Sequence, residues 1–278
     1  MRIVQDERDV ALNPGQAIGV VGDVLRERSS GSIPALARGA YQLRLAESRE
    51  DREAAFRLRF LVFNLELNEG LECAYEAGYD TDEFDKTCDH LIVEHRPSQQ
   101  VVGTYRLQTG RVAGSNLGYY SEREFDFSPY EPIRNSLVEL GRASIHRDHR
   151  SFEVLTLLWR GIASYALQRN ARYLVGCSSL TSQCPQEGSD MYWRLKEFLV
   201  EPVLRTSPRP GFTIPISAAI PETPRINPPR LLRAYLSIGA QICGEPAMDR
   251  EFKTIDFLTL LDLTKLCSSA RFRFLRNE

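Results

Sequence analysis

The segment Asn135–Ile162 constrains the fold of this chain most, because it joins a strand, a short polar loop and a helix without interruption. The apolar run Leu137–Ile145 predicts a buried strand, His146–Ser151 predicts a tight loop, and apolar residues at helical spacing follow. A helix N-terminus offers free backbone N–H groups and the positive end of a dipole, which suits a phosphate. The strand also carries Glu139 and Arg142. One element therefore combines a candidate acid–base group with a candidate phosphate site.

The region before this segment begins with a strand and a helix. Tyr41–Ala46 alternates apolar and polar residues, which is typical of a strand. Ser48 is a candidate helix N-cap, with Asp51 at the third helical position in place of the usual Glu or Gln. Apolar residues at helical spacing then predict a helix over Arg49–Asn64. The acidic stretch Glu66–Asp89 lacks clear periodicity and predicts a long loop or short helices over a cleft.

The remaining patterns alternate between strands and helices, and two strands are joined by the turn RPSQQ. The predicted strands are His90–His95, Val101–Thr109, Arg172–Ser178 and Phe252–Leu263. The predicted helices are a short one near Ser121–Phe125, then Asp190–Leu199, and Pro229–Ile238 closed by Gly239. A hairpin together with alternating elements predicts an α/β fold, with a mixed sheet covered by helices.

Length and composition indicate one main domain of a soluble protein. We expect a partly ordered extension over residues 1–40, a catalytic domain over 41–265 and a basic, aromatic tail over 266–278. The formal net charge of −2 gives no support to nucleic-acid binding. No signal peptide and no run of about 18 apolar residues is present. The six cysteines show no zinc-like spacing, so we expect reduced thiols, no metal site and a cytoplasmic location.

Glu139 and Arg142 are the first candidates for chemistry. They lie three residues apart on a strand, so regular alternation predicts that they point to opposite faces. Burial in an apolar strand raises the pKa of a carboxyl group that has no cationic partner, which makes Glu139 a candidate general base for an amine. The alternative is a structural Glu–Arg network within the core.

Three carboxylates lie close together in the acidic stretch, at Asp80, Asp82 and Asp85. They suit a cationic substrate or a metal ion. The calcium-loop template fails, because Asp85 and Leu91 stand where it requires Gly and Glu. The alternative without a functional role is a solvent-exposed acidic loop.

Arginines supply possible partners for these acids. Arg59 lies four residues before Phe63 on the predicted helix, so the two share a face. Arg106 interrupts an apolar strand and needs an anionic partner there, for which Asp82, Asp85 and Glu139 are candidates. The alternative is that Arg106 extends its charged end to solvent at the sheet edge.

The loop HRDHRS precedes the predicted helix and contains His149, Arg150 and Ser151. Its basic side chains and the helix N-terminus suit one phosphate or a phosphopantetheine arm. The alternative is that the basic residues are merely exposed. A serine hydrolase is not indicated, because no GxSxG occurs, and no GxGxxG or Walker loop is present.

The ordered motifs RLRFLVF, DTDEFDxxxDHLIV, VVGTYRLQT and ELGRASI resemble the acyl-carrier-dependent branch of the GNAT superfamily. That branch includes acyl-homoserine lactone synthases, N-acyl amino acid synthases and ornithine N-acyltransferases, which make lyso-ornithine lipid. LWRGIASYALQRNARYLVGCSSL and NPPRLLRAYLSIGAQICGEPAMDREFKTIDFL resemble the ornithine-acylating, hemolysin-like members. The resemblance covers about Tyr41 to Leu263.

The resemblance implies a GNAT fold, whose mixed sheet is split by a V-shaped opening that admits the pantetheine arm of a thioester donor. It also implies an ion-pair network around an amine substrate. The family's positions fall on Arg59, Phe63, Asp82, Asp85, Arg106, Glu139 and Arg142. Glu139, Arg106 and Arg142 would be catalytic, and the other four would bind substrate.

One departure bears on the donor. The loop HRDHRSFEVL lacks the glycines that let other GNAT enzymes approach the pyrophosphate of coenzyme A. An acyl carrier protein presents only one phosphodiester, so the loss favours a carrier-protein donor, held at His149, Arg150 and Ser151.

We therefore predict transfer of a 3-hydroxyacyl group from an acyl carrier protein to the α-amine of an amino acid, ornithine in our interpretation. No metal and no permanently bound cofactor is required. Peripheral contact with the inner membrane face is expected, assisted by the tail ARFRFL. The alternatives are acylation of glycine or another amino acid, autoinducer synthesis, and a catalytically silent module that binds acyl carrier protein.

Overall fold

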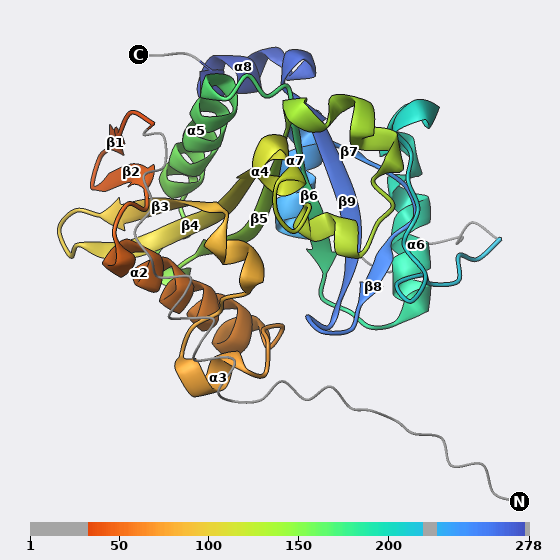
Figure 1. Ribbon diagram of the computed structural model, residues 1–278, viewed down its shortest axis with the longest axis horizontal. Helices are drawn as coiled ribbons and strands as arrows, with labels where there is room; N and C mark the ends of the chain where they lie inside the picture. Colours follow the sequence, from red (N-terminus) through yellow and green to blue (C-terminus); the bar gives the residue numbers. More distant parts are fainter. Residues whose placement is uncertain (1–32, 219–226, 276–278) are drawn as a thin grey trace, which may run out of the picture.

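The computed structural model describes residues 33–218 and 227–275, which form a mixed sheet of nine strands with helices on both faces (Figure 1). Strands β1 to β5 are antiparallel neighbours in chain order, β5 and β6 are parallel, and β9 follows β6 and also pairs with β7 and β8. The strands are β1 Leu36–Arg38, β2 Tyr41–Leu45, β3 Asp89–His95, β4 Gln100–Thr109, β5 Leu137–Ile145, β6 Tyr173–Leu180, β7 Gln241–Ile242, β8 Ala247–Asp249 and β9 Thr254–Asp262. The expected mixed sheet is confirmed.

Helices α2 and α5 cover opposite faces of the first half of the sheet. Leu91 and Val93 of β3 pack in the same core as α5, whereas the intervening Ile92 packs with Ala55 of α2, as strand alternation requires. The α-helices are α2 Arg49–Phe60, α3 Ala74–Ala77, α4 Gly110–Gly114, α5 Phe152–Gln168, α6 Pro185–Leu195, α7 Arg230–Ile238 and α8 Ser268–Leu275. Short 3-10 turns are η2 Glu83–Lys86, η3 Tyr120–Arg123, η4 Ser128–Ser136, η5 Arg147–His149, η6 Lys196–Phe198, η7 Pro202–Leu204 and η8 Leu263–Lys265.

The start of α2 is confirmed, and its end differs from the prediction. The Ser48 hydroxyl accepts the backbone N–H of Asp51, and the Asp51 carboxylate accepts that of Ser48, which completes a capping box. The α-helix ends at Phe60, and a π-helical turn, η1 Leu61–Leu67, follows. Such turns often occur at functional sites. Phe63 lies in this turn.

Both ends of the domain differ from the sequence-based boundaries. Strand β1 pairs with β2, so the sheet begins before Tyr41; residues 1–32 of the expected extension lie outside the described residues. In the expected tail, Ala270 of α8 is buried in the main core and the Phe274 ring lies 5.7 Å from that of Trp159. Part of the tail therefore packs against α5. Within the described residues, no helix is both long and apolar enough to cross a membrane.

The sheet divides between β5 and β6. These strands pair with each other only over three positions, from Leu137 opposite Tyr173 to Glu139 opposite Val175. Beyond that point both strands continue without pairing to one another, β5 along β4 and β6 along β9 (Figure 1). Gly176 lies at the division, where an added Cβ atom would come within 2.2 Å of the Leu140 carbonyl oxygen. The V-shaped opening implied by the sequence resemblance is thus present, and it begins beside Glu139.

Candidate active site

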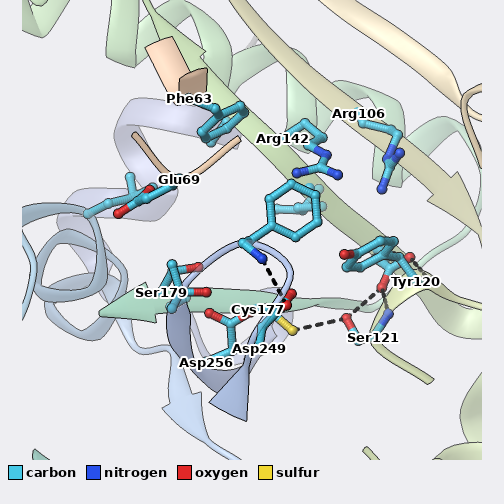
Figure 2. Close-up of a pocket in the computed structure, with 18 of the residues that line it drawn as sticks. Phe63, Glu69, Arg106, Tyr120, Ser121, Arg142, Cys177, Ser179, Asp249 and Asp256 are labelled. Atoms are coloured by element: carbon cyan, nitrogen blue, oxygen red, sulfur yellow. Dashed lines mark hydrogen bonds between the residues drawn. The ribbon is translucent and has the colours of Figure 1, made fainter. Parts of the chain in front are cut away.

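A cavity occupies the opening between the separated strands (Figure 2). Phe63 and Arg142 lie on one side of it, and Cys177, Asp249 and Asp256 lie on the other. An apolar slot adjoins it, because residues 140–143 line both spaces. The slot is lined further by Tyr105, Trp159, Leu174, Tyr235 and Leu261. The site therefore has a chamber lined by several charged side chains and an adjoining apolar channel, both of which begin at the division of the sheet.

Glu139 and Arg142 both line this cavity, so the prediction that they point to opposite faces is wrong. The reason is a β-bulge. The register between β4 and β5 shifts between Thr104 and Arg106, and Arg142 has a left-handed φ of 52°. An extra residue in one strand breaks the two-residue alternation and redirects the following side chain. The bulge thereby brings a carboxylate and a guanidinium to one cavity.

The carboxylate of Glu139 is held by the turn η3. It accepts hydrogen bonds from the backbone N–H groups of Tyr120 and Ser121, each at 2.8 Å, and from the Ser121 hydroxyl at 2.6 Å. Burial raises the pKa of Glu139, and the hydrogen bonds from Ser121 and Tyr120 and the nearby Arg106 oppose this rise. The geometry leaves a fixed carboxyl group, with a raised pKa, at the wall of the chamber.

Three arginines and three aspartates form an ion-pair network behind the chamber. Arg59 lies 2.6 Å from Asp80 and 2.9 Å from Asp85. Arg106 lies 2.6 Å from Asp82 and 3.1 Å from Asp85. We call Asp80, Asp82 and Asp85 the arginine-paired cluster. This network confirms that Arg106 meets carboxylates and does not extend to solvent.

Charges within this network balance. Arg142 supplies the third cation, 3.2 Å from Asp82 and 3.6 Å from Asp80. Burial penalises the charge on Asp85, but the attraction of Arg59 and Arg106 outweighs it and holds the pKa of Asp85 well below its ordinary value. The pKa of Asp82 is lowered as well, because Arg106 and Arg142 outweigh burial. The three arginines and three aspartates have no net charge together. Glu139 is therefore not needed to neutralise an arginine of this network.

The expected substrate-binding residues do not all reach the cavity. Phe63, Arg106, Glu139 and Arg142 line it. Arg59, Asp82 and Asp85 do not; they lie behind the wall, paired with one another or with the other arginines. An aspartate already engaged by two guanidinium groups has little capacity to hold another cation. The expectation that Asp82 and Asp85 face a cationic substrate is therefore corrected.

Aromatic rings fix the guanidinium of Arg142 on the chamber wall. Its Cζ atom lies 4.0 Å from the ring centre of Phe252, 5.5 Å from that of Tyr120 and 5.8 Å from that of Phe63. Such cation–π contacts favour a desolvated arginine. The Arg142 Nε atom is buried and has no hydrogen-bond partner among the described residues. This atom lies 3.6 Å from Asp80 Oδ1, so it faces the arginine-paired cluster.

The residues expected to hold the donor phosphate lie at the start of α5 and not on the cavity wall. The Ser151 hydroxyl accepts the backbone N–H of Val154 at 3.3 Å and caps the helix. The Arg150 guanidinium makes two hydrogen bonds to Glu66, at 2.6 and 2.7 Å. His149 Nδ1 lies 3.1 Å from the hydroxyl of Tyr41. The loop is thus held beside the N-terminus of α5 by contacts with other segments of the chain.

Sequence reasoning missed several cavity residues. The sequence predicts a short helix near Ser121 and assigns no role to its hydroxyl, because no local pattern pairs Ser121 with Glu139. Asp256 gave a usable signal, because it is a carboxylate within the apolar strand β9, the same pattern that drew attention to Glu139. With Asp249 and Glu124 it forms a second acidic group, treated below.

Comparison with known proteins supplies the family context for this site. A family model described as an acetyltransferase (GNAT) domain matches residues 58–160, which confirms the expected GNAT fold. The L-ornithine N(alpha)-acyltransferase of Brucella abortus (strain 2308) is 31% identical over 260 residues, covering 86% of this chain and 91% of that protein. The protein of the same name from Rhizobium meliloti (strain 1021) is 31% identical over 244 residues, covering 81% of each chain.

Among solved structures, the acyl-homoserine lactone synthase LasI aligns with a TM-score of 0.47 at 12% identity, over 87% of this chain and 95% of that one. FeeM, an N-acyl amino acid synthase from uncultured soil microbes, aligns with a TM-score of 0.47 at 13% identity, over 84% and 95%.

Proposed function

This chain belongs to the family of the L-ornithine N(alpha)-acyltransferases, and from that premise we propose that it transfers a 3-hydroxyacyl group from an acyl carrier protein to the α-amine of ornithine. The product is a lyso-ornithine lipid. The observation that carries the proposal is the opening beside Glu139, where an apolar channel meets a chamber lined by charged side chains. A thioester and an amine require such a meeting point.

The channel suits the donor. A pantetheine arm is narrow, and its amide groups can hydrogen-bond to the open strand edges as it extends between the separated strands toward Glu139. The loop before α5 holds the single phosphodiester of the arm at the helix N-terminus and at His149, Arg150 and Ser151. Its lack of glycines supports a carrier-protein donor over coenzyme A.

The chamber suits the amine. Glu139 removes a proton from the substrate ammonium, directly or through a water molecule, and its raised pKa strengthens it as a base. The free amine attacks the thioester carbonyl, the C–N bond forms, and the C–S bond breaks to release the pantetheine thiol. Arg142, which lines the chamber, binds the amino acid carboxylate, and Arg106 holds the acids in place.

The developing oxyanion needs donors near the thioester carbonyl. Beyond Glu139, the edge of β5 that faces β6 has no strand partner in the described structure. Backbone N–H groups on this edge are therefore available to the oxyanion. Arg59, Asp82 and Asp85 act as positioning residues, because they orient Arg106 and Arg142.

An acyl-transfer assay tests the proposal. The full chain is incubated with a radiolabelled 3-hydroxyacyl carrier protein and separate amino acids, and with the matching coenzyme A thioester as a second donor. We expect labelled ornithine, with the carrier-protein donor preferred. Labelling of glycine but not ornithine would overturn the proposal that ornithine is the acceptor. Absence of transfer to any amine would leave a silent carrier-binding module.

A further inference from the structure

A second group of buried acids lies across the chamber from Arg142, and the mechanism above does not use it. It consists of Glu124 at the end of η3, Asp249 on β8 and Asp256 on β9, which we call the unpaired acid cluster. All three are at least nine-tenths buried, and no ion pair to any of them occurs among the described residues. Figure 2 shows Asp249 and Asp256 on the wall opposite Arg142.

Hydrogen bonding within the cluster is incomplete. Both carboxyl oxygens of Glu124 and the Oδ1 atom of Asp256 are buried without a hydrogen-bond partner in the described part of the chain. Asp249 Oδ1, in contrast, accepts the backbone N–H groups of Glu251 and Phe252 at 2.8 and 3.0 Å. Asp256 lines the chamber, and Glu124 lies next to it without lining the chamber. Buried acceptors without donors are costly, so the unpartnered oxygen of Asp256 at the chamber wall points to an absent donor.

Electrostatics indicates the charge of that donor. Burial, followed by repulsion from Asp256 and Asp249, raises the pKa of Glu124 well above its ordinary value. Burial raises the pKa of Asp256 to about 6, against the opposing effect of the Ser179 hydroxyl. Asp249 raises the pKa of both Glu124 and Asp256, and such repulsion among buried carboxylates favours a cation beside them.

The cluster is linked to the catalytic carboxylate through short contacts. The Ser121 hydroxyl, 2.6 Å from Glu139, lies 3.5 Å from the Cys177 sulfur. One ligand atom each of Cys177, Glu124 and Asp256 lies within 4.8 Å of the others. A base for one amine and a receptor for a second cation therefore share one chamber. Ornithine carries two nitrogens on a four-carbon spacer, so one molecule can present two cationic groups to this chamber.

We propose that the unpaired acid cluster, chiefly Asp256 with Asp249 and Glu124, receives the side-chain ammonium of the acceptor amino acid and thereby selects a diamino acid. The proposal rests on the proposed function. The substrate carboxylate meets Arg142, its α-amine meets Glu139, and its distal ammonium meets Asp256. The two opposite walls of the chamber thus carry charges complementary to those of a diamino acid, with an arginine for its carboxylate and acids for its distal ammonium.

The test compares ornithine with norvaline, which has the same side-chain length without the distal amine. The kcat/KM values for both acceptors are measured with wild-type protein, Asp256→Asn and Glu124→Gln, with Asp126→Asn as an exposed control. We expect Asp256→Asn to lower the ornithine-to-norvaline ratio at least about 30-fold, because it removes one partner of a buried charge pair. Asp126→Asn should keep the wild-type ratio.

Other outcomes separate this inference from the proposed function. An equal loss for both acceptors, or an unchanged ratio, would overturn the inference and leave acyl transfer to ornithine standing. Absence of transfer to any amine by the wild-type protein would overturn both. Activity that requires Mn²⁺ or Zn²⁺ and is abolished by EDTA with both acceptors would make Glu124, Cys177 and Asp256 a metal site instead. Calorimetric binding of ornithine, but not norvaline, to the free chain would support the inference independently.

Discussion

Two groups of three buried acids lie on either side of the chamber, and they differ in their partners. The arginine-paired cluster meets three guanidinium groups, and the pKa values of Asp82 and Asp85 are lowered. The unpaired acid cluster meets no cation in the described structure, and the pKa values of Glu124 and Asp256 are raised. The comparison teaches that burial alone does not assign a role to a carboxylate. A paired acid supports the structure, whereas an acid without a partner is available to a ligand.

Glu139 lies between the two clusters and gives the sharpest test. We expect Glu139→Gln to lower kcat by about 10²- to 10⁴-fold, because the amide cannot accept the ammonium proton. Steady-state kinetics with ornithine measure the effect, and circular dichroism verifies the fold. Glu131→Gln, at an exposed glutamate, serves as the matched control. Unchanged turnover in Glu139→Gln would remove this residue from the base role.

Asp85→Asn should lower the free energy of unfolding more than the other substitutions considered. The change leaves Arg59 and Arg106 buried without a full counter-charge, and removal of one partner of a buried pair costs about 3–5 kcal/mol. Urea denaturation measures the free energy of unfolding. Glu66→Gln breaks the exposed pair with Arg150 and should cost at most about 1 kcal/mol. Equal losses in the two variants would contradict the structural role given to the arginine-paired cluster.

Gly176→Ala tests the division of the sheet that separates the clusters. The new methyl group would meet the Leu140 carbonyl at 2.2 Å, so the strands must shift. We expect a loss of about 1–3 kcal/mol in unfolding free energy, with reduced kcat/KM for the acyl donor. Gly114→Ala, where the nearest atom is 3.9 Å away, is the control and should be close to neutral. A fully active, stable Gly176→Ala protein would show that the close approach at this point is not needed.

The clusters also predict opposite dependences of stability on pH. Asp256 has a folded pKa of about 6, above its ordinary value, so its contribution to stability is present at low pH and is lost as pH rises through 6. Asp85 has a lowered pKa, so its contribution is present above its ordinary pKa and is lost as pH falls. Asp256→Asn should therefore gain stability relative to wild type as pH rises from about 4 to 6 and keep that gain above pH 6, on the order of 1 kcal/mol per unit of pKa shift.

Thermal unfolding of Asp256→Asn and of wild type between about pH 4 and 8 measures the effect. A stability difference between Asp256→Asn and wild type that stays constant with pH would contradict the raised pKa of Asp256.

Local sequence patterns were sufficient for most elements of the fold. The boundaries of β5, the start of β2 and the cap of α2 followed from apolar patterning and capping residues, because these depend on neighbours in the chain. The charged residues in apolar strands, Glu139 and Arg106, were recognised for a similar reason. A buried charge stands out against its immediate surroundings.

The sequence did not reveal the bulge at Arg142, the π-helical turn after Phe60 or the contact between Ser121 and Glu139. Each depends on packing between distant segments. The left-handed backbone of Arg142 is uncommon for a residue other than glycine and is maintained by the surrounding contacts. No local pattern predicts it.

The sequence by itself therefore determined a mixed sheet, the point at which a strand meets a helix N-terminus, and a set of buried acids and arginines. Only the tertiary structure decided which acids meet arginines and which do not. The physical reason is that pairing depends on distances of a few ångströms between side chains far apart in the chain. Asp85 and Arg106, or Glu124 and Asp256, have no fixed relation until the sheet closes around them.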